Sequence, residues 1–303
     1  MSNQVGFIGL GSMGYGMSVN LVKAGTGVRG YDIDAAKVER LEAAGGQACA
    51  SPEDAAKGMA LLYVCVFSGR EAAALLSPEG EVIKAAAPGA TVIMHTTMSA
   101  EASQRIAAPL LEAGYDYLEA PVTGGQVGAD AGTLTAIVSG SDQAMEKTKA
   151  DFDAMCDKVY RVGTKAGAAL TVKMINQLMV GIHVATTAEA LALAVRAGAD
   201  PNAAFEVVSN GRGNSEIFSA RGPNILAGDP EAHRTVEIFL KDLGVVLQTG
   251  QALNMALPMS SNAYQLFLAA AALGEQSQEE PSVVSLYETL NDIDIAKRAA
   301  QLK

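Results

Sequence analysis

Cysteine is scarce in this chain, and its cysteines follow no metal-binding or redox pattern. The three are Cys49, Cys65 and Cys156, with no CxxC among them. An odd number of widely separated cysteines argues against a disulfide framework and fits a reducing compartment, so we expect a cytoplasmic protein. Each thiol is expected to act as a small buried hydrophobe, and no metal site is predicted.

Basic clusters and long uninterrupted apolar runs are also missing. The formal net charge is −11 and no run of Lys and Arg occurs, which argues against nucleic acid as a partner. The stretch nearest to a membrane span, residues 177–195, is interrupted by His183 and Glu189, so no membrane partner is predicted. The opening residues lack the charged region and cleavage site of a signal peptide.

Short apolar runs alternate with helical patterns through the first half of the 303-residue chain. The predicted strands cover residues 5–8, 28–31, 61–66, 91–94, 115–118, 133–139 and 158–161. The predicted helices cover residues 13–24, 35–44, 52–57, 70–76 and 101–113. This alternation predicts a doubly wound α/β domain, in which parallel strands carry helices on both faces.

The pattern changes after Gly163. Residues 166–197 have the pattern of one long helix without proline, and Asp200-Pro201 supplies the N-cap and first residue of the next helix. Further helices are predicted at 235–252, 258–272 and 282–290, and no strand pattern occurs here. We therefore predict an α/β domain over residues 1–165 and an all-α domain over 166–303, joined by the long helix.

A glycine-rich turn, Gly9-Leu10-Gly11-Ser12-Met13-Gly14, lies between the first predicted strand and the first predicted helix. Gly9 permits a tight turn, Gly11 lets the backbone approach a pyrophosphate, and Gly14 lets the helix pack close to the strand. The helix N-terminus then offers its N–H groups to the phosphates. A bare GxGxxG is weak evidence, but this one has the right flanking elements. We therefore interpret residues 1–165 as a Rossmann-type dinucleotide-binding domain.

Asp32 ends the second strand, 18 residues after Gly14. A carboxylate at this place accepts hydrogen bonds from the adenosine ribose and repels a 2′-phosphate, so NAD is predicted over NADP. Arg29, three residues earlier on the strand, is expected to point to the opposite face. The alternative is that Asp32 only caps the next helix, although Asp34 is better placed for that.

Two further segments carry candidate chemistry. Lys173 stands among apolar residues of the long helix, and Asn176 shares its face. The segment from Glu119 to Gly125 (Glu-Ala-Pro-Val-Thr-Gly-Gly) follows a strand end, where glycine N–H groups can form an anion site. From the pattern alone, a lysine reaching solvent and an ordinary turn are the favoured interpretations, and Lys241-Asp242 is more often a surface pair.

Taken together, these motifs resemble the β-hydroxyacid dehydrogenase family, which includes 3-hydroxyisobutyrate dehydrogenase and tartronate semialdehyde reductase. The resemblance runs from the glycine turn through Ala120–Gly125 and Gly167–Asn176 to Lys241-Asp242-Leu243. It implies a Rossmann-type domain followed by a helical domain, assembled as a homodimer or homotetramer. The implied reaction is NAD-dependent oxidation of a small hydroxy acid.

The resemblance also implies roles for particular residues. Lys173 matches the catalytic lysine, which would stabilise the developing alkoxide; burial and the positive nicotinamide would lower its pKa. The substrate-binding positions are Thr123, Gly124, Gly125, Asn176 and Gln177. The cofactor-binding positions are Gly9, Leu10, Gly11, Ser12, Met13, Gly14, Asp32, Thr97 and Lys241.

Several residues depart from the family pattern. Glu119 stands where Asp is usual, Thr123 where Ser is usual, and Gln177 replaces the second amide of an Asn-Asn pair, which leaves the substrate open. The stretch 172–190 looks closest to the L-threonate dehydrogenase branch. The alternatives are a 3-hydroxyisobutyrate dehydrogenase, a semialdehyde reductase, or a sensor that binds NAD without turnover. None of the histidines, His95, His183 and His233, lies in a matched motif, so none is expected as a catalytic base.

Overall fold

The computed structural model describes residues 4–229, 236–277 and 282–302. The chain divides into two compact units, Met1–Lys173 and Met174–Lys303. This division falls within the long helix. The domain boundary predicted after residue 165, just before that helix, stays a prediction.

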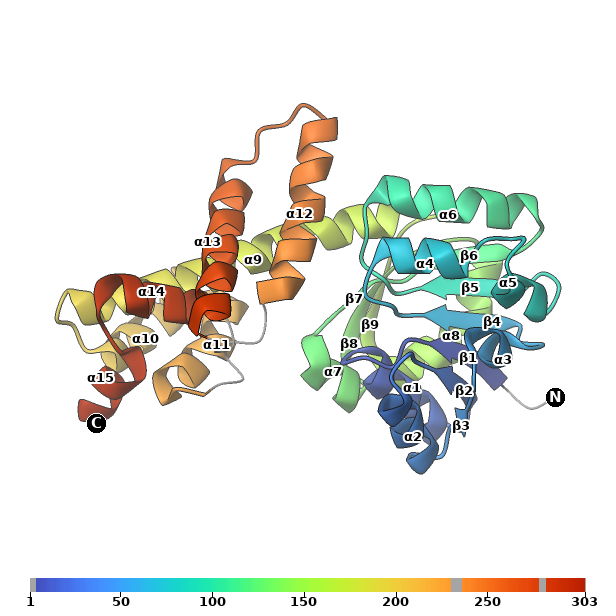
Figure 1. Cartoon of the computed structure of the whole chain (residues 1–303), viewed down its shortest axis with the longest axis horizontal. Helices are drawn as coiled ribbons and strands as arrows, with labels where there is room; N and C mark the ends of the chain where they lie inside the picture. The colour runs from blue at the N-terminus through green and yellow to red at the C-terminus, as the bar shows by residue number, and fades with distance from the viewer. Residues whose placement is uncertain (1–3, 230–235, 278–281, 303) are drawn as a thin grey trace. The chain divides into compact units, whose positions relative to one another are not determined.

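Among the described residues of the first unit, nine strands form one sheet (Figure 1). Their order is β3-β2-β1-β4-β5-β6-β8-β7, with β9 paired to β8. The order reverses at β1, and ligands of open α/β sheets bind beyond the carboxyl ends of strands at such a switch point. The strands are β1 (Gln4–Ile8), β2 (Gly27–Tyr31), β3 (Gln47–Ala48), β4 (Leu61–Val64), β5 (Thr91–Met94), β6 (Asp116–Glu119), β7 (Val122–Thr123), β8 (Leu134–Ser139) and β9 (Cys156–Gly163).

The direction of the strands is parallel from β3 to β6, as predicted, but β8 runs antiparallel to β6 and β7. The expectation of parallel strands therefore does not hold for β8 at this edge, although β8 and β9 are parallel. The reason is local: β7 has only two residues, and the short helix α7 (Gly125–Ala131) with the left-handed Gly132 turns the chain straight back into β8. A full crossover, which parallel pairing requires, does not fit into this connection.

Both faces of the sheet are covered by helices, which explains why its central strands are buried throughout. Phe7 and Tyr63 face α1 and α8, where they pack with Met17 and Phe152. Their chain neighbours point to the other face, toward α3, α5 and α6. The helices are α1 (Gly14–Lys23), α2 (Ala35–Ala43), α3 (Pro52–Ala56), α4 (Gly69–Leu75), α5 (Glu81–Ala85), α6 (Ala100–Glu112), α7 and α8 (Asp142–Met155), of which α5, α7 and α8 were not predicted.

The second unit is helical throughout its described residues. The predicted long helix is α9 (Ala168–Arg196), and the side chain of Asp200 caps α10 (Pro201–Ser209) as expected. The start of the helix predicted at 235 lies outside the described residues. The remaining helices are α11 (Glu216–Ala227), α12 (Val236–Ala252), α13 (Pro258–Ser277), α14 (Val283–Asn291) and α15 (Ile295–Gln301).

The core of this second unit forms around the later turns of α9. Ala188 and Leu191 pack there with Phe239 of α12 and Phe267 of α13, whose rings lie 4.9 Å apart. Among the described residues, α9 is the one helix long and apolar enough to cross a membrane by length and composition, a test that buried core helices also pass. The first unit, in contrast, is a doubly wound Rossmann-type domain, as the sequence predicts.

Candidate active site

The glycine turn between β1 and α1 has three different reasons for its three glycines. Gly9 has φ +96°, and a Cβ there would lie 2.3 Å from the Cys65 carbonyl oxygen. A Cβ on Gly14 would lie 1.9 Å from the Gly9 oxygen, so α1 can pack this closely only without a side chain. A Cβ on Gly11 would meet no atom within 4 Å. The fold therefore requires Gly9 and Gly14, while Gly11 leaves open space where a ligand can approach.

The N-terminus of α1 is suited to receive that ligand. Met13 is the N-cap residue and makes no side-chain cap, and the first turn contains no acidic residue. The first N–H groups of a helix need acceptors from outside it, and its dipole favours an anion there. This arrangement fits the pyrophosphate of a dinucleotide.

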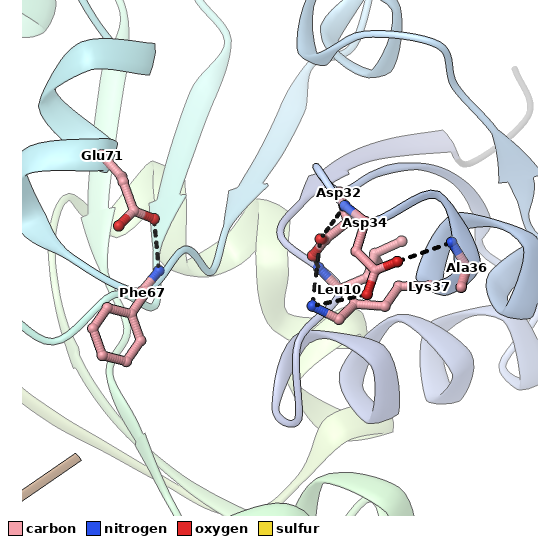
Figure 2. A network of polar contacts seen from close by, with 7 residues as sticks. All are labelled: Leu10, Asp32, Asp34, Ala36, Lys37, Phe67 and Glu71. Carbon is pink, nitrogen blue, oxygen red and sulfur yellow. Dashed lines mark hydrogen bonds and ion pairs between the residues drawn. The ribbon is translucent and has the colours of Figure 1, made fainter. Parts of the chain in front are cut away.

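Asp32 is fixed directly beside the glycine turn (Figure 2). Its Oδ2 accepts the N–H of Leu10 at 2.7 Å, and its Oδ1 accepts the N–H of Asp34 at 2.9 Å. The alternative that Asp32 caps the next helix is wrong, because Asp34 caps α2 by accepting the N–H of Ala36 at 3.1 Å. Arg29 instead donates to the Asp54 carbonyl. Asp32 is therefore held beside the glycine turn by two backbone N–H groups, and its contact with the ribose stays a prediction.

Two residues near this end of the sheet were missed by sequence reasoning. Lys37, in the first turn of α2, lies 3.5 Å from Asp32 Oδ1 (Figure 2). Phe67 follows β4 with 53% of its surface exposed, and its N–H is held by Glu71 Oε2 at 3.2 Å. Asp32 therefore has a cationic partner, which the spacing from the glycine turn does not reveal.

The segment after β5 carries a buried histidine. The His95 ring stacks on Tyr63 with centroids 5.7 Å apart, and its Nδ1 lies 2.6 Å from the Ala120 carbonyl oxygen. Burial lowers the pKa of His95 to about 4, against the hydrogen bond to Ala120. The ring is therefore neutral, and its Nδ1 donates to the carbonyl from which the Thr123 loop continues. Thr97, the predicted cofactor contact, is half-buried between β5 and α6.

The predicted substrate loop follows β6 and ends at a helix start. Thr123 pairs with Thr135 of β8 in the short strand β7, and it is half-buried. Gly124 and Gly125 have φ +126° and +63°, so both occupy conformations that other residues rarely adopt. Both glycines are exposed. They come directly after Thr123 in the chain and form the start of α7, with Gly124 as its N-cap residue.

Lys173 is buried, with 6% of its surface exposed, so the interpretation that it reaches solvent is wrong. It lies in the second turn of α9, whose first turn is held by Glu119 of β6. The Glu119 carboxylate accepts the N–H groups of Gly167 and Ala169, the latter at 3.1 Å. Sequence reasoning noted Glu119 only as a departure from the family. Its partners lie 48 and 50 residues away, and no local pattern announces them.

Asn176 and Gln177 follow Lys173 on α9 and begin a chain of polar contacts. Asn176 Nδ2 donates to Gln177 Oε1 at 3.0 Å, and Gln177 Nε2 donates to Asp242 Oδ2 at 2.5 Å. Lys241 Nζ lies 3.2 Å from Asp242 Oδ1. Asp242 is 3% exposed, so the interpretation of Lys241-Asp242 as a surface pair is wrong. The contacts predicted for these residues with substrate and cofactor stay predictions. His233 lies outside the described residues.

Comparisons with known proteins agree with this geometry. Residues 4–163 match the model of the NAD binding domain of 6-phosphogluconate dehydrogenase, and residues 167–287 match the NAD-binding model of NADP-dependent 3-hydroxyisobutyrate dehydrogenase. An L-threonate dehydrogenase of Cupriavidus necator is 36% identical over 95% of this chain and 97% of its own length. One of Escherichia coli K12 is 37% identical over 93% of this chain and 94% of its own length. A solved 3-hydroxyisobutyrate dehydrogenase from Salmonella typhimurium is 35% identical, with a TM-score of 0.84 over 94% of this chain and 99% of that one.

The doubly wound domain, its dinucleotide turn and the helical region after it define an NAD-dependent oxidoreductase acting on CH–OH groups. Within that class, the chain belongs to the β-hydroxyacid dehydrogenase family, and its cofactor is NAD.

Proposed function

We propose that this protein oxidises a hydroxyl group of a short sugar acid, with L-threonate as the first candidate. The full-length similarity to L-threonate dehydrogenases supports this substrate class. The observation that carries the proposal is the burial of Lys173 in a helix anchored to the strand end from which the Thr123 loop begins.

The residues divide the work as follows. The N–H groups of the glycine turn and α1 hold the pyrophosphate, and Asp32 accepts from the ribose hydroxyls. The Thr123 hydroxyl and the N–H groups of Gly124 and Gly125 hold the substrate carboxylate. Lys173 Nζ contacts the reacting hydroxyl and takes its proton as negative charge develops on that oxygen. Bound NAD supplies the acceptor for the hydride that leaves the carbon bearing this hydroxyl.

The decisive variant is Lys173→Ala. It should lose most of the turnover, at least about 100-fold, because general acid–base catalysis contributes roughly 10²–10⁴-fold. NAD affinity should stay within about twofold, since the pyrophosphate site lies at Gly9–Gly14. Lys173→Arg should rescue little, because a guanidinium does not release its proton near neutral pH.

The measurement is single-turnover hydride transfer, followed as NADH absorbance, beside NAD binding by calorimetry and a folding check by circular dichroism. A Lys173→Ala protein with near-native single-turnover rates would overturn the proposed mechanism. A panel of C3–C5 hydroxy acids, with the corresponding semialdehydes tested in reverse, identifies the substrate. The similarity to the Salmonella 3-hydroxyisobutyrate dehydrogenase makes 3-hydroxyisobutyrate the second candidate substrate.

We further propose that the protein assembles as a homodimer or homotetramer in the cytoplasm. Ile175, Met179 and Leu193 of α9 are 59%, 47% and 66% exposed and share one face of the helix, and an exposed apolar face of this kind fits a contact between subunits. The three cysteines are free thiols, which fits a reducing compartment. Light scattering after size-exclusion chromatography tests the assembly: a monomer at micromolar concentration contradicts it. Cell fractionation tests the location.

A further inference from the structure

We propose that Glu119 is a positioning residue: its buried carboxylate joins the helix that carries Lys173 to the strand from which the Thr123 loop begins. This inference rests on the proposed function, because it assigns Lys173 and that loop to the reaction. Glu119 does not act on the substrate itself. It fixes the distance between the two elements that do.

The contacts of Glu119 connect three elements of the first unit. It is the last residue of β6, and no part of its surface is exposed. Oε1 accepts from the Ser103 hydroxyl of α6 at 2.5 Å and from the N–H of Gly167. Oε2 accepts the N–H of Ala169 at 3.1 Å. The Ser103 hydroxyl lies in turn 2.8 Å from the hydroxyl of Tyr117, two residues before Glu119 on β6.

A carboxylate suits this place because α9 has no local cap. The residues before its first turn are Lys165, Ala166 and Gly167, and none has a side-chain acceptor. The first N–H groups of a helix need acceptors, and the positive end of the dipole favours a negative charge. Burial raises the pKa of the Glu119 carboxyl, while the hydrogen bonds from Ser103 and the α9 backbone oppose that rise.

The anchor acts on the helix face that bears the lysine. Ala169, whose N–H is bound, precedes Lys173 by four residues, so the two lie one turn apart on the same face. The helix entry is also fixed on its other side. Gly167 has φ +99°, and a Cβ there would lie 2.6 Å from the Gln104 amide nitrogen. That amide donates to the Ala166 carbonyl at 3.1 Å. The entry of α9 is therefore packed closely against Gln104 in addition to being held by Glu119.

The other side of the anchor is the backbone of Glu119 itself. Its next residue is Ala120, whose carbonyl is held by His95, and Thr123 follows three residues later. If the Glu119 side chain no longer holds α9, Lys173 and the Thr123 loop, which is proposed to bind the substrate, can move apart. A misplacement of about 1 Å can reduce turnover by about 100-fold without loss of the fold.

The test compares Glu119→Gln with Glu119→Asp. The amide in Glu119→Gln keeps the size of the side chain but presents a donor to one of the helix N–H groups. We expect kcat per NAD-binding site to fall about 10- to 100-fold, with the NAD dissociation constant within about twofold of the native value. Glu119→Asp keeps both acceptor oxygens and the charge on a shorter side chain. Its kcat per site should therefore be at least about threefold higher than that of Glu119→Gln. Single-turnover rates are normalised to NAD-binding sites counted by titration, so that unfolded protein does not contribute.

The matched control is Ser141→Ala, which removes the cap of α8, where Ser141 accepts the N–H of Ala144 at 3.0 Å. It should lower the melting temperature and leave kcat per site unchanged. If Glu119→Gln does not fold, Ser103→Ala replaces it, and a loss of about three- to tenfold in kcat per site is expected.

The outcomes separate this inference from the proposed function. If Lys173→Ala loses turnover while Glu119→Gln or its replacement keeps native kcat per site, the inference is wrong and the proposed function stands. If Glu119→Gln loses stability but not kcat per site, as Ser141→Ala is expected to, Glu119 is only structural and the inference is also wrong. If Lys173→Ala keeps native turnover, both are overturned.

Discussion

Replacing His95 with asparagine should remove a defined part of the acid sensitivity of the fold. The neutral ring is stacked in the core, and its buried Nε2 has no hydrogen-bond partner among the described residues. Protonation would place a charge there without compensation. Burial accordingly lowers the pKa of His95 from 6.5 to about 4. In the unfolded chain, the same ring binds its proton near pH 6.5.

The sign and size of the effect follow from linkage. Between pH 6.5 and about 4 the unfolded state carries a proton on His95 that the native state lacks, so native stability falls as the pH falls through this window. The pKa of His95 is lower by about 2.5 in the native state than in the unfolded chain. This difference corresponds to about 3 kcal/mol of unfolding free energy, because a change of one in pKa is worth about 1.4 kcal/mol. Between pH 8 and pH 5, His95 should therefore account for about 2 kcal/mol of lost stability.

The assay is urea unfolding at pH 8, 6.5 and 5, followed by circular dichroism for the native protein and His95→Asn. Asparagine keeps an amide donor but does not titrate, and its packing defect is the same at each pH. Burial also raises the pKa of Asp151 and of Glu119, but both groups titrate in both proteins and cancel in the difference. A ring proton resonance of His95 that titrates near pH 6.5, or equal acid losses in the two proteins, would refute the reasoning.

Four further predictions concern the glycine turn, Asp32 and the Lys241–Asp242 pair of α12. Asp32→Ser should reduce the preference in kcat/KM for NAD over NADP by at least about tenfold, about 1.4 kcal/mol, through lost ribose hydrogen bonds and lost repulsion of a 2′-phosphate; an unchanged ratio contradicts this. Gly14→Ala should lower stability without NAD by about 1–3 kcal/mol, because its Cβ would overlap the Gly9 carbonyl. Gly11→Ala should leave the melting temperature unchanged without NAD but weaken NAD binding. A lower melting temperature with native NAD affinity would contradict the role assigned to Gly11. Asp242→Asn should cost about 1–3 kcal/mol in thermal unfolding because the buried Asp242 side chain loses the negative charge that binds Gln177 and Lys241, whereas Asp157→Asn on the exposed edge strand should cost little.

The parts of the site that could be predicted from sequence have their determinants close together in the chain. Gly9, Gly11 and Gly14 lie within six residues, and the strand and helix around them are defined by local periodicity. Asp32 follows because the connection from Gly14 through α1 and β2 has a characteristic length. The antiparallel β8 could not be predicted in the same way, because its direction depends on how α7 and Gly132 turn the chain rather than on the strand's own apolar pattern.

The contacts that hold the site together also join residues that are far apart in the chain. His95 meets Ala120 across 25 residues, and Glu119 meets α9 across about 50. In each case, a buried polar side chain forms a hydrogen bond with a backbone group that only the tertiary fold brings near. Sequence reasoning identifies Glu119 as a departure from a family pattern, but it does not show what the side chain contacts. Composition also favours solvent as the default place for a lysine or glutamate, which explains the wrong interpretation of Lys173 from pattern alone.

The departure at Gln177 has a physical explanation of this kind. Glutamine is one methylene longer than asparagine, and its amide reaches Asp242, which lies 65 residues further along the chain, at 2.5 Å. The oxygen of the same amide accepts from Asn176 at 3.0 Å. Both ends of Gln177 are therefore engaged within the protein, so its amide orients Asn176. Since Asp242 is itself paired with Lys241, the orientation of Asn176 depends on a chain of contacts that ends at the other predicted ligand-binding lysine. The departure at Gln177 leaves the substrate preference open. That preference should therefore depend on which side-chain group Asn176 presents, and Gln177 and Asp242 fix the orientation of Asn176.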